Sequence, residues 1–185
     1  NFWQTGPLGS TQIATLLSYA ANKKYSKVAV VSDNTELSQL TTKSFKASLE
    51  KAGIQVVSEE VISRGTTTAE PQMQKVRAAN PEAIFLTGFL TPENALILRA
   101  YRQLGMKSAL LGNFNFSTPQ TAAVAKGLLD GLAFVDAFDP AKPEVARFVE
   151  SFKKETGNEP YNLNGYGYDG RMLVADAIKR GGSTD

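Results

Sequence analysis

Four acidic side chains near predicted strand ends and one glycine-rich hexapeptide are the residues whose types and spacing could do chemistry. The acids are Asp33, Glu36, Asp136 and Asp139. A phosphoacceptor site needs an acidic pair after the first strand and an aspartate ending the third, where this sequence has Thr87-Gly88. Paired carboxylates for hydrolysis stay open on spacing, but nothing else supports them, and Asp33 is more typical of a turn or cap.

The hexapeptide GYGYDG (165–170) matches the G-x-G-x-x-G pattern of dinucleotide-binding turns. That pattern holds a pyrophosphate only where a strand precedes it and a helix begins at its glycines. Here NEPYNLN precedes it, which is not a strand pattern. We therefore interpret the glycines as positions that let a helix pack closely against its neighbours.

The sequence contains no histidine and no cysteine among its 185 residues. Disulfides, thiolate nucleophiles, histidine-based metal sites and histidine acid–base catalysis are thereby excluded. It also has no phosphate-binding loop, and no serine has a histidine to activate it. The sequence predicts a protein that is not an enzyme and that uses no cofactor and no metal.

The composition indicates a globular chain of one domain. Hydrophobic residues make up 42% of it, charged residues 21%, and the net charge is +2. A chain of this length buries roughly two-thirds of its unfolded surface, which is enough for a core. No cluster of lysine and arginine is long enough to predict a nucleic-acid or lipid surface. The longest apolar runs are well short of a membrane span.

Helix and strand patterns alternate along the chain. Short apolar runs predict five buried strands, at residues 27–33, 54–62, 83–88, 108–113 and 131–138. Helical spacing begins at Ser10 or Thr11, separates the strands, and returns near 145–152 and 164–180. This order predicts an α/β fold, a doubly wound, Rossmann-like three-layer arrangement of about five parallel strands. We expect 27–33 at its centre and 83–88 beside it, with the topological switch point between them.

The apolar positions of the intervening helices predict which side each helix buries. The helix after the first strand is expected to stop at Gly53 and to turn a set of apolar residues toward the core, namely Leu37, Leu40, Phe45, Leu49 and Ala52. The helix after the third strand is expected to stop at Gly105.

Each predicted strand ends in small or polar residues. These tails are Ser32-Asp33, Thr87-Gly88, Gly112-Asn113 and Asp136. In open α/β sheets ligands bind at the carboxyl ends of strands, near the switch point. Gly88 would let the chain turn sharply and leave Phe89 and Leu90 on the edge where a ligand lies. The alternative is that a neighbouring loop simply covers these two side chains.

Several segments, in this order, resemble the type I periplasmic binding proteins, most closely the branched-chain amino-acid-binding family of ABC transporters. The stretch that enters the second lobe of that family is similar to FWQTGPLGSTQIATLLSYAANKKYSKVAVVSDN, and its second strand with a Gly-Thr loop to GIQVVSEEVISRGTTT. The resemblance continues in register through NPEAIFLTGF, RAYRQLGMKSALLGN, GLAFVDAFDP and FVESFKKETGNEPYNLNGYGYDGRMLVADAIKRGG. Each motif is weak, whereas their order and spacing together are specific.

The resemblance implies that residues 1–185 form a single α/β ligand-binding lobe, the second or C-terminal lobe of a two-lobed protein. Residues 1–5 would be a crossover segment between lobes, and the missing N-terminal lobe would precede Asn1. Members of this family clamp a small ligand between their lobes and present it to an ABC permease in the membrane. The implied location is periplasmic.

The resemblance also implies a ligand site at strand ends, formed by Leu37, Phe89, Leu90, Phe114 and Asn115. Some amino-acid binders place a carboxylate after the fourth strand to hold the ammonium group of the ligand, where this sequence has NFNF (113–116). That departure disfavours an α-amino acid. It favours an apolar or aromatic ligand, such as a carboxylate held mainly by the other lobe.

The sequence thus predicts the solute-binding lobe of an extracytoplasmic protein, whose small organic ligand is amino-acid-like or an apolar or aromatic carboxylate. The alternative is a ligand-sensing regulatory domain or a small α/β enzyme, because the fold alone does not decide function. An apolar edge left open on a single lobe further predicts that the isolated lobe self-associates.

Overall fold

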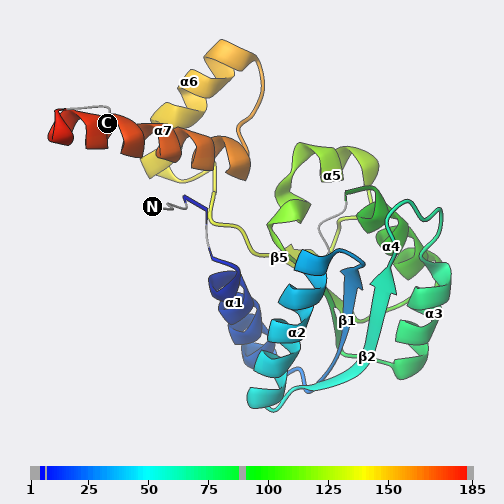
Figure 1. The fold of residues 1–185 in the computed structure, drawn as a ribbon. Helices are drawn as coiled ribbons and strands as arrows, with labels where there is room; N and C mark the ends of the chain where they lie inside the picture. Colours follow the sequence, from blue (N-terminus) through cyan, green and yellow to red (C-terminus); the bar gives the residue numbers. More distant parts are fainter. Residues whose placement is uncertain (1–4, 7, 88–90, 183–185) are drawn as a thin grey trace. The chain divides into compact units, whose positions relative to one another are not determined.

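The computed structural model describes residues 5, 6, 8–87 and 91–182 (Figure 1). The residues of the chain fall into two compact units, each of which makes most of its contacts within itself. The sheet unit comprises Gly9–Val135, and the helical unit comprises Asn1–Leu8 with Asp136–Asp185. All strands of the described residues lie in the sheet unit, so the α/β layers that the sequence predicts for 1–185 are built from residues 9–135.

Five parallel strands form one sheet. Their bounds are Lys27–Asp33 (β1), Gln55–Ile62 (β2), Ala83–Leu86 (β3), Ala109–Gly112 (β4) and Leu132–Phe134 (β5). The order across the sheet is β2-β1-β3-β4-β5, which confirms the doubly wound fold and the switch point between β1 and β3. The middle strand is β3 rather than β1, because two strands extend the sheet beyond β3 and only one extends it beyond β1.

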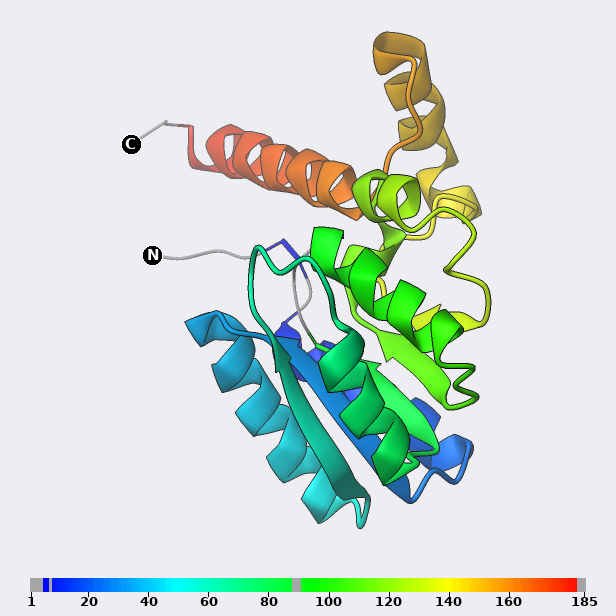
Figure 2. The ribbon, with the colours of Figure 1, turned by 90° about the vertical axis from the view of Figure 1, so that its right-hand side faces the viewer.

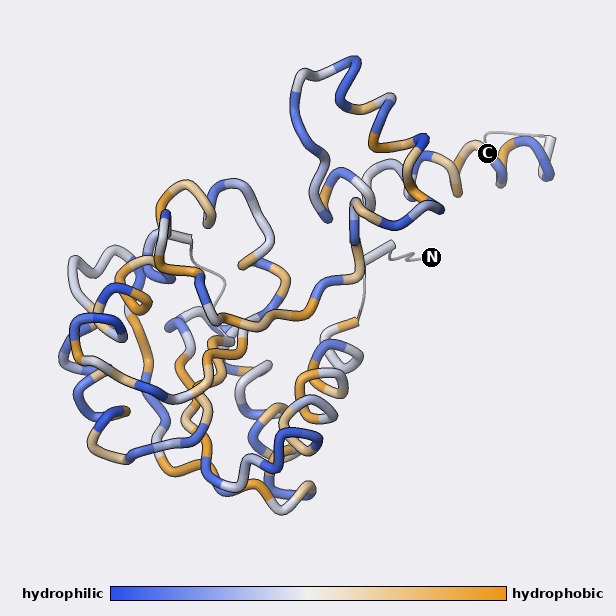
Figure 3. The backbone as a smooth tube through the Cα atoms, turned by 180° about the vertical axis from the view of Figure 1, so that it is seen from behind, coloured by the Kyte–Doolittle hydropathy of each residue, from blue (hydrophilic) through white to orange (hydrophobic). Residues whose placement is uncertain are grey.

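Helices cover both faces of this sheet, as Figure 2 shows. They are α1 (Gly9–Asn22), α2 (Glu36–Lys51), α3 (Glu70–Ala79), α4 (Thr91–Gln103) and α5 (Pro119–Val124). Val28 and Val30 of β1 pack with residues of α1 and α2, whereas Ala29 and Val31 pack with residues of α3 and α4. Both faces of β1 are therefore buried, which explains its continuous apolar run. In Figure 3, where the colour gives the hydropathy of each residue, hydrophobic residues lie along these strands.

Helix α2 presents a different side to the core than the sequence predicted. Leu37 and Leu40 are 65% and 58% exposed, and Ala52 is exposed as well. The buried residues of α2 are Ser38, Thr42, Phe45 and Leu49. The prediction was therefore right for Phe45 and Leu49 and wrong for the two leucines of the first turns and for Ala52.

Two hydroxyl groups account for this rotation of α2. Ser38 Oγ accepts a hydrogen bond from the backbone amide of Asp33 at 3.3 Å, and the hydroxyls of Thr42 and Thr87 lie 3.0 Å apart. A buried polar group is tolerated where it is hydrogen-bonded, so these two positions can replace apolar ones on the inner side. An apolar pattern alone does not reveal such partners.

The ends of the elements follow local sequence signals. Thr35 is the N-cap of α2, and its Oγ1 accepts a hydrogen bond from the Ser38 amide at 3.3 Å. Gly53 and Gly105, which were expected to stop α2 and α4, have φ angles of +72° and +62°. Glycine adopts this left-handed conformation without the steric cost that a Cβ brings.

Strand β5 is shorter than the predicted 131–138. Its last residue is Phe134, and the amide of Val135 still donates to the carbonyl of Gly112 at 3.2 Å. At Asp136 the chain enters the helical unit. Residues 136–138 therefore continue the apolar pattern of a strand without pairing in the sheet.

The helical unit contains a short 3-10 helix, η2 (Pro143–Val145), and two α-helices, α6 (Ala146–Thr156) and α7 (Asn162–Gly181). Phe148 joins its aromatic residues: its ring centroid lies 6.0 Å from that of Phe138, 5.8 Å from Phe152 and 4.8 Å from Tyr168. Helix α7 exposes many large apolar side chains, namely Leu163, Tyr168, Met172, Leu173, Val174 and Ile178. None of the described helices combines the length and apolar character of a membrane span.

Candidate functional site

The carboxyl end of β1 is closed by a turn around Asp33. Its Oδ1 accepts hydrogen bonds from the backbone amide of Thr35 at 2.8 Å and from the Thr35 hydroxyl at 2.5 Å. Asp33 is 2% exposed. This carboxylate therefore shapes the turn into α2, which is the turn role that the sequence favoured for it.

The carboxyl end of β3 is anchored by the hydroxyl of Thr87. The Thr87 hydroxyl meets Thr42 of α2 at 3.0 Å and lies 3.3 Å from the carbonyl of Val31, which also accepts the Thr87 amide at 2.9 Å. Both threonines are buried. Thr87 thus fixes the point at which the chain leaves the sheet.

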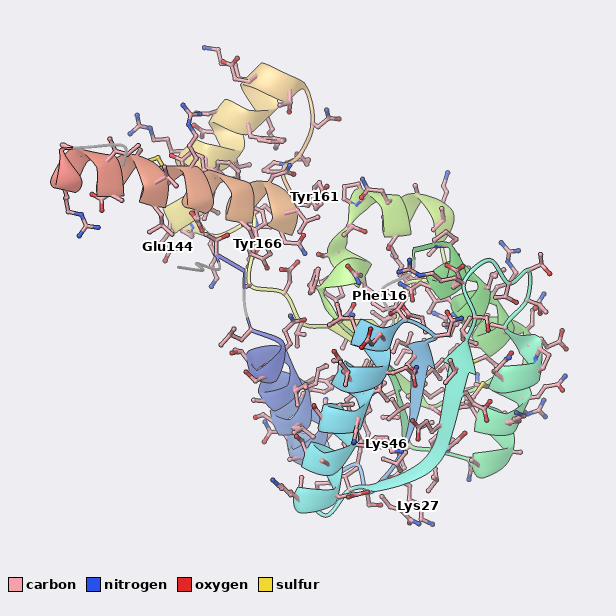
Figure 4. The ribbon with its side chains drawn as sticks, in the orientation of Figure 1. Lys27, Lys46, Phe116, Glu144, Tyr161 and Tyr166 are labelled. Atoms are coloured by element: carbon pink, nitrogen blue, oxygen red, sulfur yellow. The ribbon has the colours of Figure 1, made fainter. Side chains whose placement is uncertain are left out.

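The carboxyl end of β4 continues into a second 3-10 helix, η1 (Phe114–Ser117). The Asn113 side chain accepts the Asn115 amide at 3.1 Å, and the Ser117 hydroxyl donates to the carbonyl of Phe114 at 2.8 Å. Phe116, labelled in Figure 4, is buried against Gly112, where an added Cβ would lie 2.3 Å from its ring. Glycine is required at this strand end because the ring occupies the place of a side chain.

The side chain of Asn115 carries a donor that no described residue accepts from. Its Nδ2 is buried and has no hydrogen-bond partner among the described residues. A buried donor in that state costs about 1–3 kcal/mol unless something accepts from it. A ligand with an oxygen acceptor at this position would remove that cost.

Three of the five predicted ligand-binding residues fall on this edge. Leu37 lies in the first turn of α2 after β1, and Phe114 and Asn115 lie in η1 after β4. Because β3 separates β1 from β4, the two strand ends are roughly 10 Å apart. Phe89 and Leu90 lie outside the described residues, so their place on the edge stays a prediction.

The sequence reasoning missed two buried residues at the same edge, Glu93 and Asn94 in the first turn of α4. Glu93 Oε1 accepts the backbone amide of Gly65, in the loop after β2, at 2.8 Å. The sequence contains a signal for this burial. Glu93 and Asn94 stand four residues before Ile97 and Leu98, so they lie on the same inner face of α4.

A small cavity of about 10 Å³ lies beside these two residues. Its polar lining is Ser32, Asp33, Glu93 and Asn94. That volume is about what one water molecule requires. A ligand of organic size would therefore lie on this edge, and this cavity could not enclose it.

In the sheet unit, the carboxyl group with a shifted pKa is that of Glu82, which lies at the opposite edge of the sheet, where the parallel strands begin. The backbone amides of Ser26 and Lys27 donate to Glu82 Oε2 at 2.5 and 3.0 Å, and these bonds lower the pKa of Glu82. This exposed carboxylate ties the start of β3 to the start of β1. Within the described part of the chain, no group of three or more histidine, cysteine, aspartate or glutamate residues could hold a metal ion.

Comparisons with known proteins agree with this architecture. A leucine-binding protein from Thermotoga maritima has a TM-score of 0.87 and 31% sequence identity, covering 98% of this chain and 53% of its own. Leu/Ile/Val-binding protein homolog 3 of Brucella melitensis is 26% identical over 100% of this chain and 50% of its own length. An amino acid binding protein from Pseudomonas aeruginosa is 28% identical over 88% of this chain and 44% of its own length.

The chain therefore spans about half the length of the curated relatives it matches. The sequence model described as periplasmic binding protein matches residues 1–185, which is the whole chain. The resemblance found in the sequence is confirmed, and the chain belongs to the periplasmic binding protein family.

Proposed function

We propose that the sheet unit is one lobe of the solute-binding protein of an ABC importer and binds a small organic ligand at its carboxyl edge. The observation that carries this proposal is Asn115, whose buried Nδ2 has no acceptor among the described residues and lies on the edge where α/β sheets bind ligands. Phe114 stands beside it on the same short helix and offers an aromatic wall. Two relatives are named a leucine-binding protein and a Leu/Ile/Val-binding protein homolog, and these names support a ligand of amino-acid size.

The ligand class follows from the acids at this edge. The two buried ones already accept hydrogen bonds inside the protein: Asp33 from Thr35, and Glu93 from Gly65. The segment 113–116 offers amides and aromatic rings in place of a carboxylate. This lobe thus suits an apolar or aromatic carboxylate whose oxygen accepts from Asn115, and an amino-acid ligand would need its ammonium partner elsewhere.

The proposal includes a second lobe for two reasons. The carboxyl edge would contact a ligand on one side only, because its small cavity cannot enclose one. The chain also has about half the length of its relatives. The apolar side chains that α7 exposes are the surface on which we expect the remaining half of the full-length protein to pack. The sheet unit would then be the lobe, and the helical unit would complete the other one. Without that half, the same exposed side chains favour self-association of this chain.

The remaining elements of the proposal follow from the same function. A solute-binding protein of an importer acts outside the cytoplasm and presents its ligand to a permease in the membrane. Ligand binding by backbone and side-chain groups requires no catalysis, so we expect no turnover of the ligand.

The test uses pairs of ligands that differ only in the ammonium group. Calorimetry on the full-length protein compares L-leucine with 4-methylpentanoate and L-phenylalanine with 3-phenylpropanoate. We expect the deaminated acids to bind at least as tightly as their amino-acid partners, and Asn115→Leu to weaken binding about tenfold or more, since it removes a hydrogen bond to a charged group.

Gln120→Leu provides the control, because Gln120 is an exposed residue of the following helix α5. It should leave the affinity of every ligand unchanged. Equal effects of the two substitutions would remove Asn115 from the site. A strong preference for the amino acids would instead show that the ammonium partner is present and that the proposed ligand class is wrong.

A further inference from the structure

The chain passes between its two units twice, after Leu8 and after Val135. On the side of the helical unit, the described residues nearest to these two passages are Thr5, Gly6 and Leu8 in the first connecting segment and Asp136 to Phe138 in the second. Both connecting segments contact the same stretch of α7, the GYGYDG motif at 165–170. The proposed solute-binding function does not yet give these contacts a role.

Tyr166 touches both connecting segments. Its ring lies against Gly6, where an added Cβ would be 3.4 Å from the ring carbon Cδ2. Its hydroxyl donates to Asp136 Oδ1 at 3.3 Å. Asn162, one turn earlier on α7, donates from Nδ2 to Asp136 Oδ2 at 3.0 Å. Figure 4 shows Tyr166 on α7.

The glycines of the motif complete the contact. An added Cβ on Gly165 would lie 2.9 Å from Cδ2 of Phe138, and one on Gly170 would lie 3.6 Å from Cγ2 of Thr5. Gly167 has nothing within 4 Å of the same position. Gly165 therefore cannot carry a side chain while Phe138 stays in place, which bears out the close-packing interpretation of the motif for this glycine.

Phe138 itself is fixed from two sides. Its backbone amide donates to Asp136 Oδ1 at 3.2 Å, and its ring meets that of Phe148 edge to face at a centroid distance of 6.0 Å. The second connecting segment is thus held to α7 by Phe138 on Gly165 and by Asp136 on Asn162 and Tyr166.

We propose that Asn162, Gly165 and Tyr166 are positioning residues that anchor both connecting segments on α7 and confine bending between the units to the backbone beyond this anchor. The bending would fall at Leu8–Gly9 and Val135–Asp136, because hinges are a few terminal residues of otherwise rigid elements. Two connections held on one helix cannot move independently of each other. This functional part rests on the proposed binding of a ligand between two lobes, whereas the anchor itself does not.

The test compares two glycines of one helix in the full-length protein without ligand. Gly165→Ala should displace Phe138 and raise hydrogen exchange of the Phe138 amide about tenfold or more. Gly167→Ala, where a Cβ meets open space, should leave that exchange unchanged. The amides of β1 should exchange equally in both variants and so show that the sheet unit is intact.

A rescue variant separates this anchor from a general loss of stability. Phe138→Ala removes the ring that the new Cβ of Gly165→Ala would meet. Gly165→Ala should therefore raise hydrogen exchange of the amide at position 138 less in a protein that already carries Phe138→Ala than in the wild type. Tyr166→Phe, a milder change, should raise exchange at Asp136–Phe138 and keep the fold. Equal exchange in Gly165→Ala and Gly167→Ala, or an unchanged Tyr166→Phe, would overturn the anchor. Because no ligand is used, that result is distinct from a failure of ligand binding.

Discussion

The hydroxyl of Tyr166 loses a proton less readily than that of an ordinary tyrosine. Burial, together with the negative charge and hydrogen bond of Asp136, raises the pKa of Tyr166 from 10.0 to about 12. The folded protein therefore favours the protonated form. The stabilisation from this residue is complete below pH 10 and is lost as the pH rises from 10 to about 12.

A pH series of thermal unfolding tests this residue. The wild-type protein should lose stability between pH 10 and about 12 more steeply than Tyr166→Phe, which has no proton to lose there. At pH 8 the variant should already be less stable, because the hydrogen bond to Asp136 is gone. Parallel curves for the two proteins across this range would show that Asp136 and burial do not act on Tyr166 in the folded state.

At the scale of elements, the start of α2 depends on one cap residue. Thr35 Oγ1 accepts the Ser38 amide and donates to the carboxylate of Asp33. Thr35→Ala should lower the free energy of unfolding by about 1 kcal/mol, which is typical of a lost N-cap. Chemical denaturation measures the change.

Thr41→Ala on the same helix is the control for this prediction. Thr41 is half-buried, and its hydroxyl donates to the carbonyl of Leu37 in a solvent-exposed hydrogen bond within the helix. Alanine has the higher helix propensity, so this variant should be as stable as the wild type or slightly more stable. If both variants lose the same stability, Thr35 does not act as a cap.

The elements that sequence reasoning predicted are those whose signals are local. KVAVVSD is β1 with the predicted bounds, and Gly53 stops α2 because a left-handed residue there favours glycine. The inner side of α2 was partly missed, since Ser38 and Thr42 are buried by partners on β1 and β3 that no helical pattern contains. Glu93 and Asn94 were missed for a related reason: a search for apolar residues at helical spacing does not include polar ones, although their spacing continues the core face of α4.

For the candidate site, the sequence predicts an edge of the sheet and the positions that lie on it, but not the hydrogen bonds of each side chain. Phe114 and Asn115 could be placed after β4 from the strand pattern and the family resemblance. The buried Nδ2 of Asn115, which no described residue accepts from, could not be predicted, because its surroundings depend on how η1 folds over Gly112. Leu37 is on the expected turn but was also assigned to the core, and its exposure agrees only with the site.

At the scale of the whole molecule, the account requires more chain than the two units described. The sheet unit has buried cores on both faces of its sheet, whereas α7 of the helical unit buries few side chains and exposes large apolar ones. The curated relatives are about twice as long as this chain. These observations together support a ligand that two lobes enclose, with the carboxyl edge of the sheet unit as one wall.

The most direct test of this account is one calorimetric titration carried out on two proteins, this chain and the full-length protein. The ligand is whichever of the four acids binds the full-length protein most tightly. The account predicts that the full-length protein binds it about two or more orders of magnitude more tightly, because a pocket between lobes buries most of a small ligand whereas one edge leaves it in water. Equal affinity of the two proteins would contradict the two-lobed site.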